Sequence, residues 1–591
     1  MSRADLVLLH APSVYDFRHE SILYGPVSDV VPSMPVFEMY PVGFTSMASY
    51  LERHGYRVRI INLAHRMLRS KSFSVERELA RLHPLAFGID LHWLPHAQGA
   101  LAIAQLCKQL HPDIPVLFGG FSSTYYHEEL IRRPEVDYVL RGDSTEEPLL
   151  QLIDHLATGR NELASIPNLT WRDSSGIHAN PLTYVPETLD RFDIDYGYVM
   201  RSVARYLDLN GVIPFLGWMD YPITAALTCK GCSNTCNTCG GSAFTSRRSY
   251  GRSRPAFRSP KDLARDVRRI AEFSHGPVFI LGDLRQPGDD YAEQFLAALG
   301  KAPSRLMLEV FEPAPRSFYE KVASVAPDFT MEISLESHDD EVRRAFGRRY
   351  TAAAAEESIA AALDCGCARY DVFFMIGLPK QTAASVLGTV DYCQHLLERF
   401  SEGGKPRVLP FLSPLAPFLD PGSPVFENPE QFGYRLFHRT LEEHRRALLS
   451  PSWKYVLNYE TQWLSRDEIV DVTYAAALRL NRIKQSFGLI DAASADAVEK
   501  RIGRAQRLIR QIDDIMAITD EGRRRKLLEA LKPQVDMANV STVCEKRELN
   551  LPVGLRKIRW LGAARAVLDG LVRPARSENL ATATIQTRTD A

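Results

Sequence analysis

Four cysteines, Cys229, Cys232, Cys236 and Cys239, fall within eleven residues of a chain that has only nine cysteines in 591 residues. Clustering of this kind, without the evenly spread cysteines of a disulfide framework, is typical of metal or redox chemistry. Cys232, Cys236 and Cys239 have the spacing C-x3-C-x2-C. Three thiolates on one tight loop can each bind one iron of a [4Fe–4S] cube, so that the fourth iron stays open to a small molecule.

Two other interpretations of this loop follow from the same residues. All four thiolates could hold a structural zinc ion, although zinc ribbons usually bring two knuckles together from distant segments. Cys229 could also close the cluster as a fourth ligand, but it lies at the end of a predicted strand, where a packed thiol is expected. The other five cysteines are scattered, and we expect them to be small core residues: Cys107, Cys365, Cys367, Cys393 and Cys544.

The overall composition is that of a globular protein, with 45% apolar and 24% charged residues. The net charge of −1 gives no basic field for nucleic acid or an anionic membrane. The apolar run at the start is too short for a secretion signal, and no segment is apolar enough to span a bilayer, so we expect a cytoplasmic protein without a membrane span. The length predicts several domains.

Strand and helix patterns alternate over the first part of the chain. This alternation predicts a doubly wound parallel sheet over residues 1–160, with ligands beyond the carboxyl ends of its strands. The strand-like segments are 6–12, 57–63, 85–91, 115–123 and 136–144. Small residues that follow these strands are Gly119, Gly120, Ser122, Ser123 and Gly142.

The rest of the chain divides into four further segments. Residues 161–215 read as a linker with a hairpin whose turn lies at 174–176. Six strand-like segments over 216–425 predict a partial (β/α)6 barrel, whose chemistry sits at the carboxyl ends of the strands. Amphipathic patterns over 426–572 predict a helical C-terminal domain in which the strands stop. The polar stretch 573–591 is expected to be a flexible tail.

The cysteine triad after the first barrel strand resembles that of the radical S-adenosylmethionine (SAM) superfamily. The sheet before it resembles the cobalamin (B12)-binding domain that precedes many members, and residues 38–62 and 116–152 match that domain in pattern. The resemblance implies that Cys232, Cys236 and Cys239 bind a [4Fe–4S] cluster whose open iron is chelated by SAM. It also implies reductive cleavage of SAM to a 5′-deoxyadenosyl radical, which abstracts hydrogen from a substrate.

The same resemblance implies residues for SAM. Gly282 and Asp283 partly match the turn that contacts the SAM amine, although a plain strand-end turn explains them as well. Glu336 occupies the position of a ribose ligand, and Glu309 is a weaker candidate for that role. Arg348 occupies the position that binds the SAM carboxylate, or else it is one charge of a solvated run. The stretch from Met375 to Gly377 resembles the adenine-binding segment.

Cobalamin is implied in the same way. Asp90 and His92 look at first like the Asp-x-His-x-x-Gly motif, but Pro95 replaces its glycine and the segment follows the third strand. We therefore do not assign His92 as the cobalt ligand. His92 or His96 could lie under the corrin, but we expect both to be capping or packed histidines. The predicted cobalamin contacts are Gly119, Gly120, Ser122 and Ser123 for the nucleotide tail and Gly142 for the corrin. Some domains of this shape lack the cofactor, so its presence stays open.

Two further features of the sequence, a run of arginines and a pair of aromatic residues, each allow two interpretations. Five arginines in 246–258 form either a solvated face or a strip for a carboxylate or phosphate of the substrate. Tyr459 and Trp463 either reach the substrate or belong to the core. After residue 425 only Cys544 remains, so an auxiliary cluster is not expected there.

These patterns favour a cobalamin-dependent radical SAM enzyme that methylates an unactivated carbon of a small-molecule or lipid-like substrate. An alternative is a cyclase or rearrangement enzyme of the same family without net methyl transfer. A non-catalytic, zinc-stabilised binding protein is the alternative of another class. We expect an electron donor such as a flavodoxin or ferredoxin as partner, and no nucleic acid. The sequence assigns no catalytic side chain.

Overall fold

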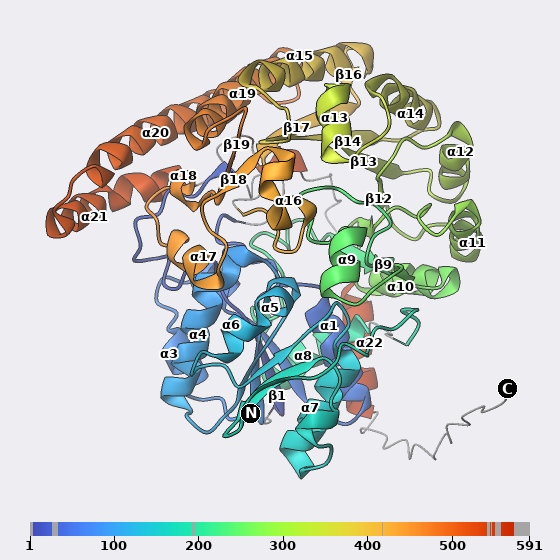
Figure 1. Ribbon diagram of the computed structural model, residues 1–591. Coiled ribbons are helices and arrows are strands. Elements are labelled where there is room, and N and C mark those ends of the chain that lie inside the picture. Colours follow the sequence, from blue (N-terminus) through green and yellow to red (C-terminus); the bar gives the residue numbers. More distant parts are fainter. Residues whose placement is uncertain are drawn as a thin grey trace.

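The computed structural model describes residues 4–26, 34–191, 195–415, 418–539, 544, 546–549 and 557–572. The predicted tail at 573–591 lies outside these residues. Within them the chain forms a mixed, mostly parallel N-terminal sheet, a parallel central sheet and a largely helical C-terminal part (Figure 1). The predicted α/β fold class is confirmed.

The N-terminal sheet has the strand order β2-β1-β3-β4-β5-β6-β7. Its first five strands are parallel, and the chain reverses its direction of travel across the sheet between β1 and β3, which makes a switch point where ligands of such sheets bind. The parallel strands are β1 (Leu6–His10), β2 (Val58–Asn62), β3 (Ala86–Asp90), β4 (Val116–Gly119) and β5 (Tyr138–Leu140). The surrounding helices are α1 (Gly43–Arg53), α2 (Leu63–Arg69), α3 (Val75–Leu79), α4 (Ala97–Leu110), α5 (Phe121–Tyr125), α6 (His127–Ile131) and α7 (Glu146–Thr158).

The predicted hairpin is present and extends this sheet. Strand β6 (Leu169–Asp173) pairs antiparallel with β5 and with β7 (Gly176–Ala179). The predicted linker therefore contributes two strands to the N-terminal sheet, and it also contains helix α8 (Gly197–Tyr206).

The central sheet contains six parallel strands in the order β17-β14-β13-β12-β11-β8. It remains open between β17 and β8, as a partial barrel does. Its strands are β8 (Thr224–Leu227), β11 (Val278–Leu281), β12 (Leu306–Val310), β13 (Phe329–Glu336), β14 (Arg369–Ile376) and β17 (Val408–Pro414). Its helices are α9 (Ala243–Ser249), α10 (Pro260–Phe273), α11 (Asp289–Leu299), α12 (Arg316–Val325), α13 (Asp340–Phe346), α14 (Ala352–Asp364) and α15 (Ala383–Arg399). Short antiparallel pairs join β9 (Cys229–Lys230) to β10 (Ala256–Phe257) and β15 (Ser401–Glu402) to β16 (Lys405–Pro406).

The C-terminal part is not purely helical. The sequence predicted that strands stop after residue 425, but β18 (Tyr434–Leu436) and β19 (Tyr459–Thr461) form an antiparallel pair. Each has three residues, too few to show a two-residue hydrophobic period. The helices are α16 (Pro424–Glu427), α17 (Leu441–Ala447), α18 (Trp453–Val456), α19 (Arg466–Ser486), α20 (Ala492–Met516), α21 (Glu521–Ala538) and α22 (Trp560–Val572). Short 3₁₀ helices span Leu94–His96, Leu163–Ser165, Pro429–Phe432 and Lys546–Leu549.

The C-terminal part covers the side of the central sheet at β17. Helix α19 packs against β17, and the Lys484 ammonium lies 4.5 Å from the centre of the Phe411 ring. Lys484 forms a buried ion pair of 2.8 Å with Glu548. Helix α22 returns to pack on α8 and α10, so the end of the described chain lies beside the N-terminal half (Figure 1).

Candidate functional site

The cysteine loop leaves the carboxyl end of β8 and is fixed at several points before α9 begins. Asn237 donates through its side-chain amide to the Ala345 carbonyl, at 2.7 Å. The Gly240 amide donates to Asp420 at 2.8 Å, and the Tyr250 hydroxyl donates to the Gly240 carbonyl at 3.2 Å. The loop is therefore held by helix α13 and by the segment that follows β17.

The thiols of the triad differ from Cys229 in their surroundings. Backbone amides donate to the Cys232 and Cys239 sulfurs, at 3.4 and 3.3 Å, as they do to cluster thiolates. Cys229 instead donates to the Gly231 carbonyl within its own turn, at 3.6 Å. Burial raises the pKa of Cys229 to about 12 and that of Cys236 to about 11. A positive metal centre at the loop would offset that cost of ionisation.

A single metal ion fits this loop poorly. Across the described ranges, no group of three or more His, Cys, Asp or Glu side chains is arranged to hold one ion. Structural zinc requires four ligands converging on one point. A cube makes no such demand, because its three thiolates bind three separate irons. The two interpretations of the loop therefore differ in the number of thiolates that must converge on one point.

The turn after β11 contains the first two predicted SAM residues. Gly282 has φ +103°, and a β-carbon placed there would lie 3.2 Å from the Cys229 sulfur, so the turn requires glycine. Its amide donates to the Glu309 carboxylate. Burial raises the pKa of Glu309 to about 7. Asp283 is already paired with Arg285, at 2.7 Å, and also accepts the Phe311 amide.

Glu336 and Arg348 form a buried ion pair of 3.0 Å at the carboxyl end of β13. The solvated alternative for Arg348 is wrong, because this residue is only 9% exposed. Its neighbour Gly347 lies against the cysteine loop, since a β-carbon there would be 3.1 Å from the Thr235 carbonyl oxygen. The second oxygen of Glu336 is buried without a partner. A ligand hydroxyl can satisfy it.

The predicted adenine segment lies at the same edge, but its backbone groups already have partners. Gln381 accepts the Gly377 amide at 2.8 Å and donates to the Met375 carbonyl at 2.9 Å. The Tyr434 hydroxyl donates to the Gly377 carbonyl at 2.7 Å. Gln381 is fully buried and was missed from the sequence, where only its place just after Pro379 could have drawn attention. Tyr459 is buried beside Tyr434 and belongs to the core.

The predicted cobalamin residues line the carboxyl edge of the N-terminal sheet. Gly120 has φ +113°, and a β-carbon there would meet the His92 backbone at 2.7 Å. The Ser122 hydroxyl donates to the His92 carbonyl at 3.3 Å, and the Ser123 hydroxyl donates to the Gly119 carbonyl at 3.0 Å. The Gly142 amide, at φ +105°, donates to the Thr124 hydroxyl at 2.9 Å. Both serine hydroxyls therefore satisfy backbone carbonyls, one just after β3 and one at the end of β4.

A buried ion pair occupies the switch point of this sheet. His10, at the end of β1, lies 2.9 Å from Asp90, at the end of β3. Burial by itself lowers the pKa of His10, but the Asp90 carboxylate raises it more, so the net shift is upward. His96 donates to the Phe37 carbonyl at 2.9 Å, and burial lowers the pKa of both His92 and His96 to about 4. His96 is thus a packed, neutral imidazole, as expected.

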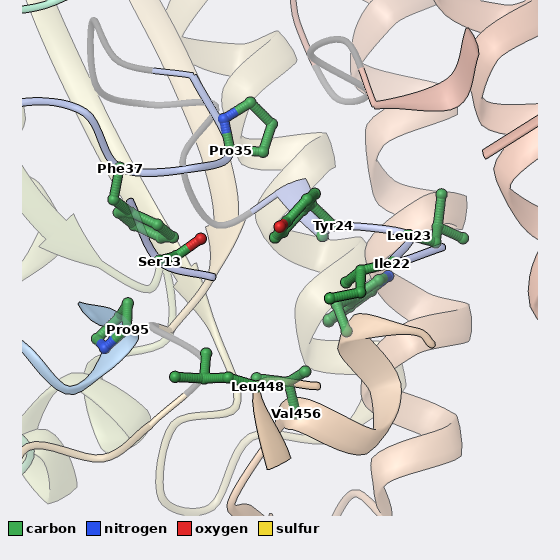
Figure 2. Close-up of a pocket in the computed structure, with 11 residues that line it drawn as sticks. Ser13, Ile22, Leu23, Tyr24, Pro35, Phe37, Pro95, Leu448 and Val456 are labelled. Atoms are coloured by element: carbon green, nitrogen blue, oxygen red, sulfur yellow. The ribbon is translucent and has the colours of Figure 1, made fainter. Parts of the chain in front are cut away.

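A small cavity lies beside this switch point, between the N-terminal sheet and the C-terminal helices (Figure 2). It is mostly apolar and holds about 40 Å³, enough for a few water-sized groups. The Ser13 and Tyr24 hydroxyls are both buried at this cavity and lie close to each other.

The arginines after the loop do not form an anion strip. Arg252 is buried with Asp143, with a 2.8 Å bond from Nη2 to Oδ1, and Arg258 is buried with Asp266 at 2.7 Å. Arg248 lies at the surface beside Glu427. Both the solvated and the substrate-binding interpretations are therefore wrong for Arg252 and Arg258, whose partners the sequence did not reveal.

The two carboxyl edges are joined by further contacts. Lys230, next to Cys229, pairs with the buried Glu146 at 3.1 Å. The Tyr250 ring stacks on Phe121 of α5, with centroids 4.8 Å apart. In Figure 1, α9 accordingly lies over α5 and α1. The contacts place the cysteine loop against the end of the N-terminal sheet.

Comparisons with known proteins match both halves of this arrangement. A family model described as the B12 binding domain matches residues 31–150, and one described as the Radical SAM superfamily matches residues 227–393. The chain therefore carries a match to a B12 binding domain followed by a match to a radical SAM domain, in the order that the sequence predicted. The two matches imply a [4Fe–4S] cluster, SAM and cobalamin as cofactors, as predicted.

Individual relatives are distant. The chain is 24% identical over 247 residues to an anaerobic magnesium-protoporphyrin IX monomethyl ester cyclase of Rubrivivax gelatinosus, over 41% of each chain. It is 24% identical over 258 residues to the enzyme of that name from Synechocystis sp., over 42% of this chain and 45% of the relative. It therefore spans less than half the length of these curated relatives.

One solved structure shares the fold. It is the radical S-adenosylmethionine methyltransferase TsrM from Kitasatospora setae with cobalamin and a [4Fe–4S] cluster bound. The TM-score is 0.55 at 17% identity, over 83% of this chain and 90% of that one. Among the described residues, no helix is both long and apolar enough to cross a bilayer.

Proposed function

We propose that this radical SAM enzyme methylates an unactivated carbon of a small-molecule or lipid-like substrate. The observation that carries the proposal is the placement of the cysteine loop, at the end of β8, against the carboxyl edge of the cobalamin-type sheet. When bound, the cluster supplies the electron that splits SAM, and cobalamin supplies a cobalt centre that carries a methyl group. The chain's own residues hold these groups and the substrate together.

The roles of the SAM residues follow from their contacts. Cys232, Cys236 and Cys239 hold the cluster. Arg348 lies beside the loop and already carries a buried carboxylate partner, Glu336, so its guanidinium is fixed in direction. The SAM carboxylate then meets a preoriented cation, and the unpartnered Glu336 oxygen accepts a ribose hydroxyl.

At the carboxyl edge of the N-terminal sheet, the proposed role of the glycines is to leave room for cobalamin beside the backbone. Gly120 and Gly142 have positive φ angles and no side chain, so the backbone comes close to a ligand there. Ser122 and Ser123 hold the ends of the strands in place.

A second candidate function is cyclisation or rearrangement without net methyl transfer. The curated relatives favour it, since both are named as cyclases. SAM with a trideuterated methyl group separates the two functions. A substrate product that gains the labelled methyl supports methylation, and a product without the label supports cyclisation or rearrangement.

SAM cleavage itself is tested first. Full-length protein, reconstituted without oxygen, should form 5′-deoxyadenosine from SAM with dithionite or with a flavodoxin or ferredoxin as reductant. The Cys236→Ala variant should lose this product completely, because one iron loses its thiolate. Cys229→Ala is the matched control and should keep it, since Cys229 bonds within its own turn. Full activity of Cys236→Ala would refute the cluster assignment.

A further inference from the structure

The two faces of the central sheet have different surroundings. Ile280, Leu308 and Met331 lie in the hydrophobic core that the helices cover. Alternate residues point to the opposite face, because side chains alternate along a strand. This inner face is only partly buried, since Glu332 is half-buried between the buried Met331 and Ile333. It is therefore the face of the sheet that the helix-covered hydrophobic core does not fill.

Three carboxyl groups lie side by side on this inner face. Glu309 of β12 is in register with Glu332 of β13, and Glu332 is in register with Asp371 of β14. Residues in register on parallel strands share a face, and neighbouring strands are about 4.8 Å apart. The three side chains thus form one row across the sheet.

The row contains more carboxyl groups than cations. Asp371 is paired with Arg369, at 2.6 Å to Nε. Glu309 accepts the Gly282 amide. The Glu332 side chain makes no hydrogen bond within the described residues, and Arg369, already paired with Asp371, is the cation that acts on its carboxyl group. The nearby cations Arg348 and Lys484 have partners of their own. Burial, and then the charges of Glu309 and Asp371, raise the pKa of Glu332 well above its usual range.

A second polar group points to a ligand at the same place. Thr330 precedes Glu332 by two residues on β13 and is in register with Met307 and Arg369, so it shares the inner face. It is only 2% exposed, and its hydroxyl has no hydrogen-bond partner. A buried hydroxyl without a partner costs free energy unless a bound group satisfies it.

The chemistry of these groups selects the ligand. A metal ion is not favoured, since the described residues contain no group of three or more suitable ligands arranged for one ion. An ammonium group has three donors and a positive charge, and Glu309, Glu332 and Thr330 offer three acceptors. Above them, the half-buried Phe373 and Met375 give an apolar wall.

We propose that the substrate carries a primary amine, held as an ammonium ion between Glu309 and Glu332 with the Thr330 hydroxyl as its third acceptor. The proposal rests on the proposed function, because it takes the inner face of the barrel as the substrate site. It adds the class of substrate, an amine with an apolar body.

The test measures binding without turnover. Full-length protein carrying cluster and cobalamin, with saturating SAM and no reductant, is titrated calorimetrically with phenethylamine and with its neutral counterpart phenethyl alcohol. The amine should bind about tenfold more tightly, because a charged hydrogen bond is worth more than a neutral one. Glu332→Gln should erase this preference, and Thr330→Val should weaken amine binding about threefold. Glu320→Gln, on exposed α12, is the matched control and should change nothing.

Equal binding of the two probes, no binding of either, or an unchanged preference in both Glu332→Gln and Thr330→Val overturns the proposal. Competition between phenethylamine and SAM also overturns it, because the row would then serve the ammonium of SAM. Thr330→Val keeps the test valid if Glu332→Gln fails to fold. A protein that prefers the amine yet forms no 5′-deoxyadenosine would refute the proposed function alone.

Discussion

The two carboxyl edges of this protein differ in how their polar groups are satisfied. At the N-terminal sheet, His10 pairs with Asp90, and the serine hydroxyls after β4 bond to strand-end carbonyls. At the central sheet, one oxygen of Glu336, at the carboxyl end of β13, is buried without a hydrogen-bond partner in the described part of the chain. The first edge is organised largely by the chain itself, and the second leaves a buried acceptor that a ligand can satisfy.

The largest expected effect comes from breaking the connection between the two edges. Asp143→Ala leaves the buried Arg252 without its carboxylate, which should lower the free energy of unfolding by about 3–5 kcal/mol. Asp328→Ala removes the exposed partner of Arg305 and should cost about 1 kcal/mol or less. Denaturant unfolding of both variants measures the difference. Equal losses would show that the Asp143 contact does not fix the two sheets.

The next effect is on SAM. Arg348→Gln removes the cation that we assign to the SAM carboxylate, and SAM affinity should fall roughly 10- to 100-fold. Arg348→Lys keeps the charge but loses the bidentate geometry, and should retain part of the affinity. Calorimetric titration with SAM checks both. If Arg348→Gln binds SAM with unchanged affinity, Arg348 does not bind the SAM carboxylate and serves only as the ion-pair partner of Glu336.

A smaller effect is the pH dependence of folding stability that the His10–Asp90 pair causes at the N-terminal edge. The His10 pKa is raised above 6.5 in the folded protein, so its stabilisation is complete below pH 6.5 and is lost as pH rises through the higher folded value. Burial by itself raises the Asp90 pKa, but His10 lowers it below 3.8, so its contribution is lost only as pH falls through that lower value. Glu38 and His96 also face the pair.

Unfolding measured from pH 5 to pH 9 should therefore show wild-type stability decreasing above pH 6.5 by more than that of His10→Gln. Two parallel curves would mean that this ion pair is not charged in the folded state.

The smallest effect concerns the turn after β11. Gly282→Ala places a side chain at φ +103° and close to the Cys229 sulfur, which should cost about 1–2 kcal/mol. The melting temperature measures this loss. Gly288→Ala, also at positive φ but with open space around it, separates backbone strain from the contact with sulfur.

Local patterns in the sequence were enough to predict the alternating strands, the hairpin and the cysteine loop, because each depends on residues that are close together in the sequence. The partners of Arg252 and Lys230 could not be predicted, since Asp143 lies 109 residues and Glu146 84 residues away. Gln381 was missed for a related reason, because its bonds to Met375 and Gly377 depend on how the chain turns after β14.

The row of carboxyl groups on the inner face of the central sheet could not be predicted from the sequence either. Glu309 and Glu332 each read as an isolated acidic residue inside an apolar strand, and only the register of β12 with β13 makes them neighbours. The roles of the SAM and cobalamin residues remain predictions for the variants above.

Arg369 joins the barrel to the far end of the chain, since it contacts Asp371 and also donates to the Glu548 carbonyl, 179 residues later. Glu548 in turn neutralises Lys484. A version shortened just before residue 546 would lose Glu548 and leave the buried Lys484 ammonium without its carboxylate. The C-terminal helices therefore cannot be discarded to make a minimal catalyst, and any truncation must keep the chain through residue 549.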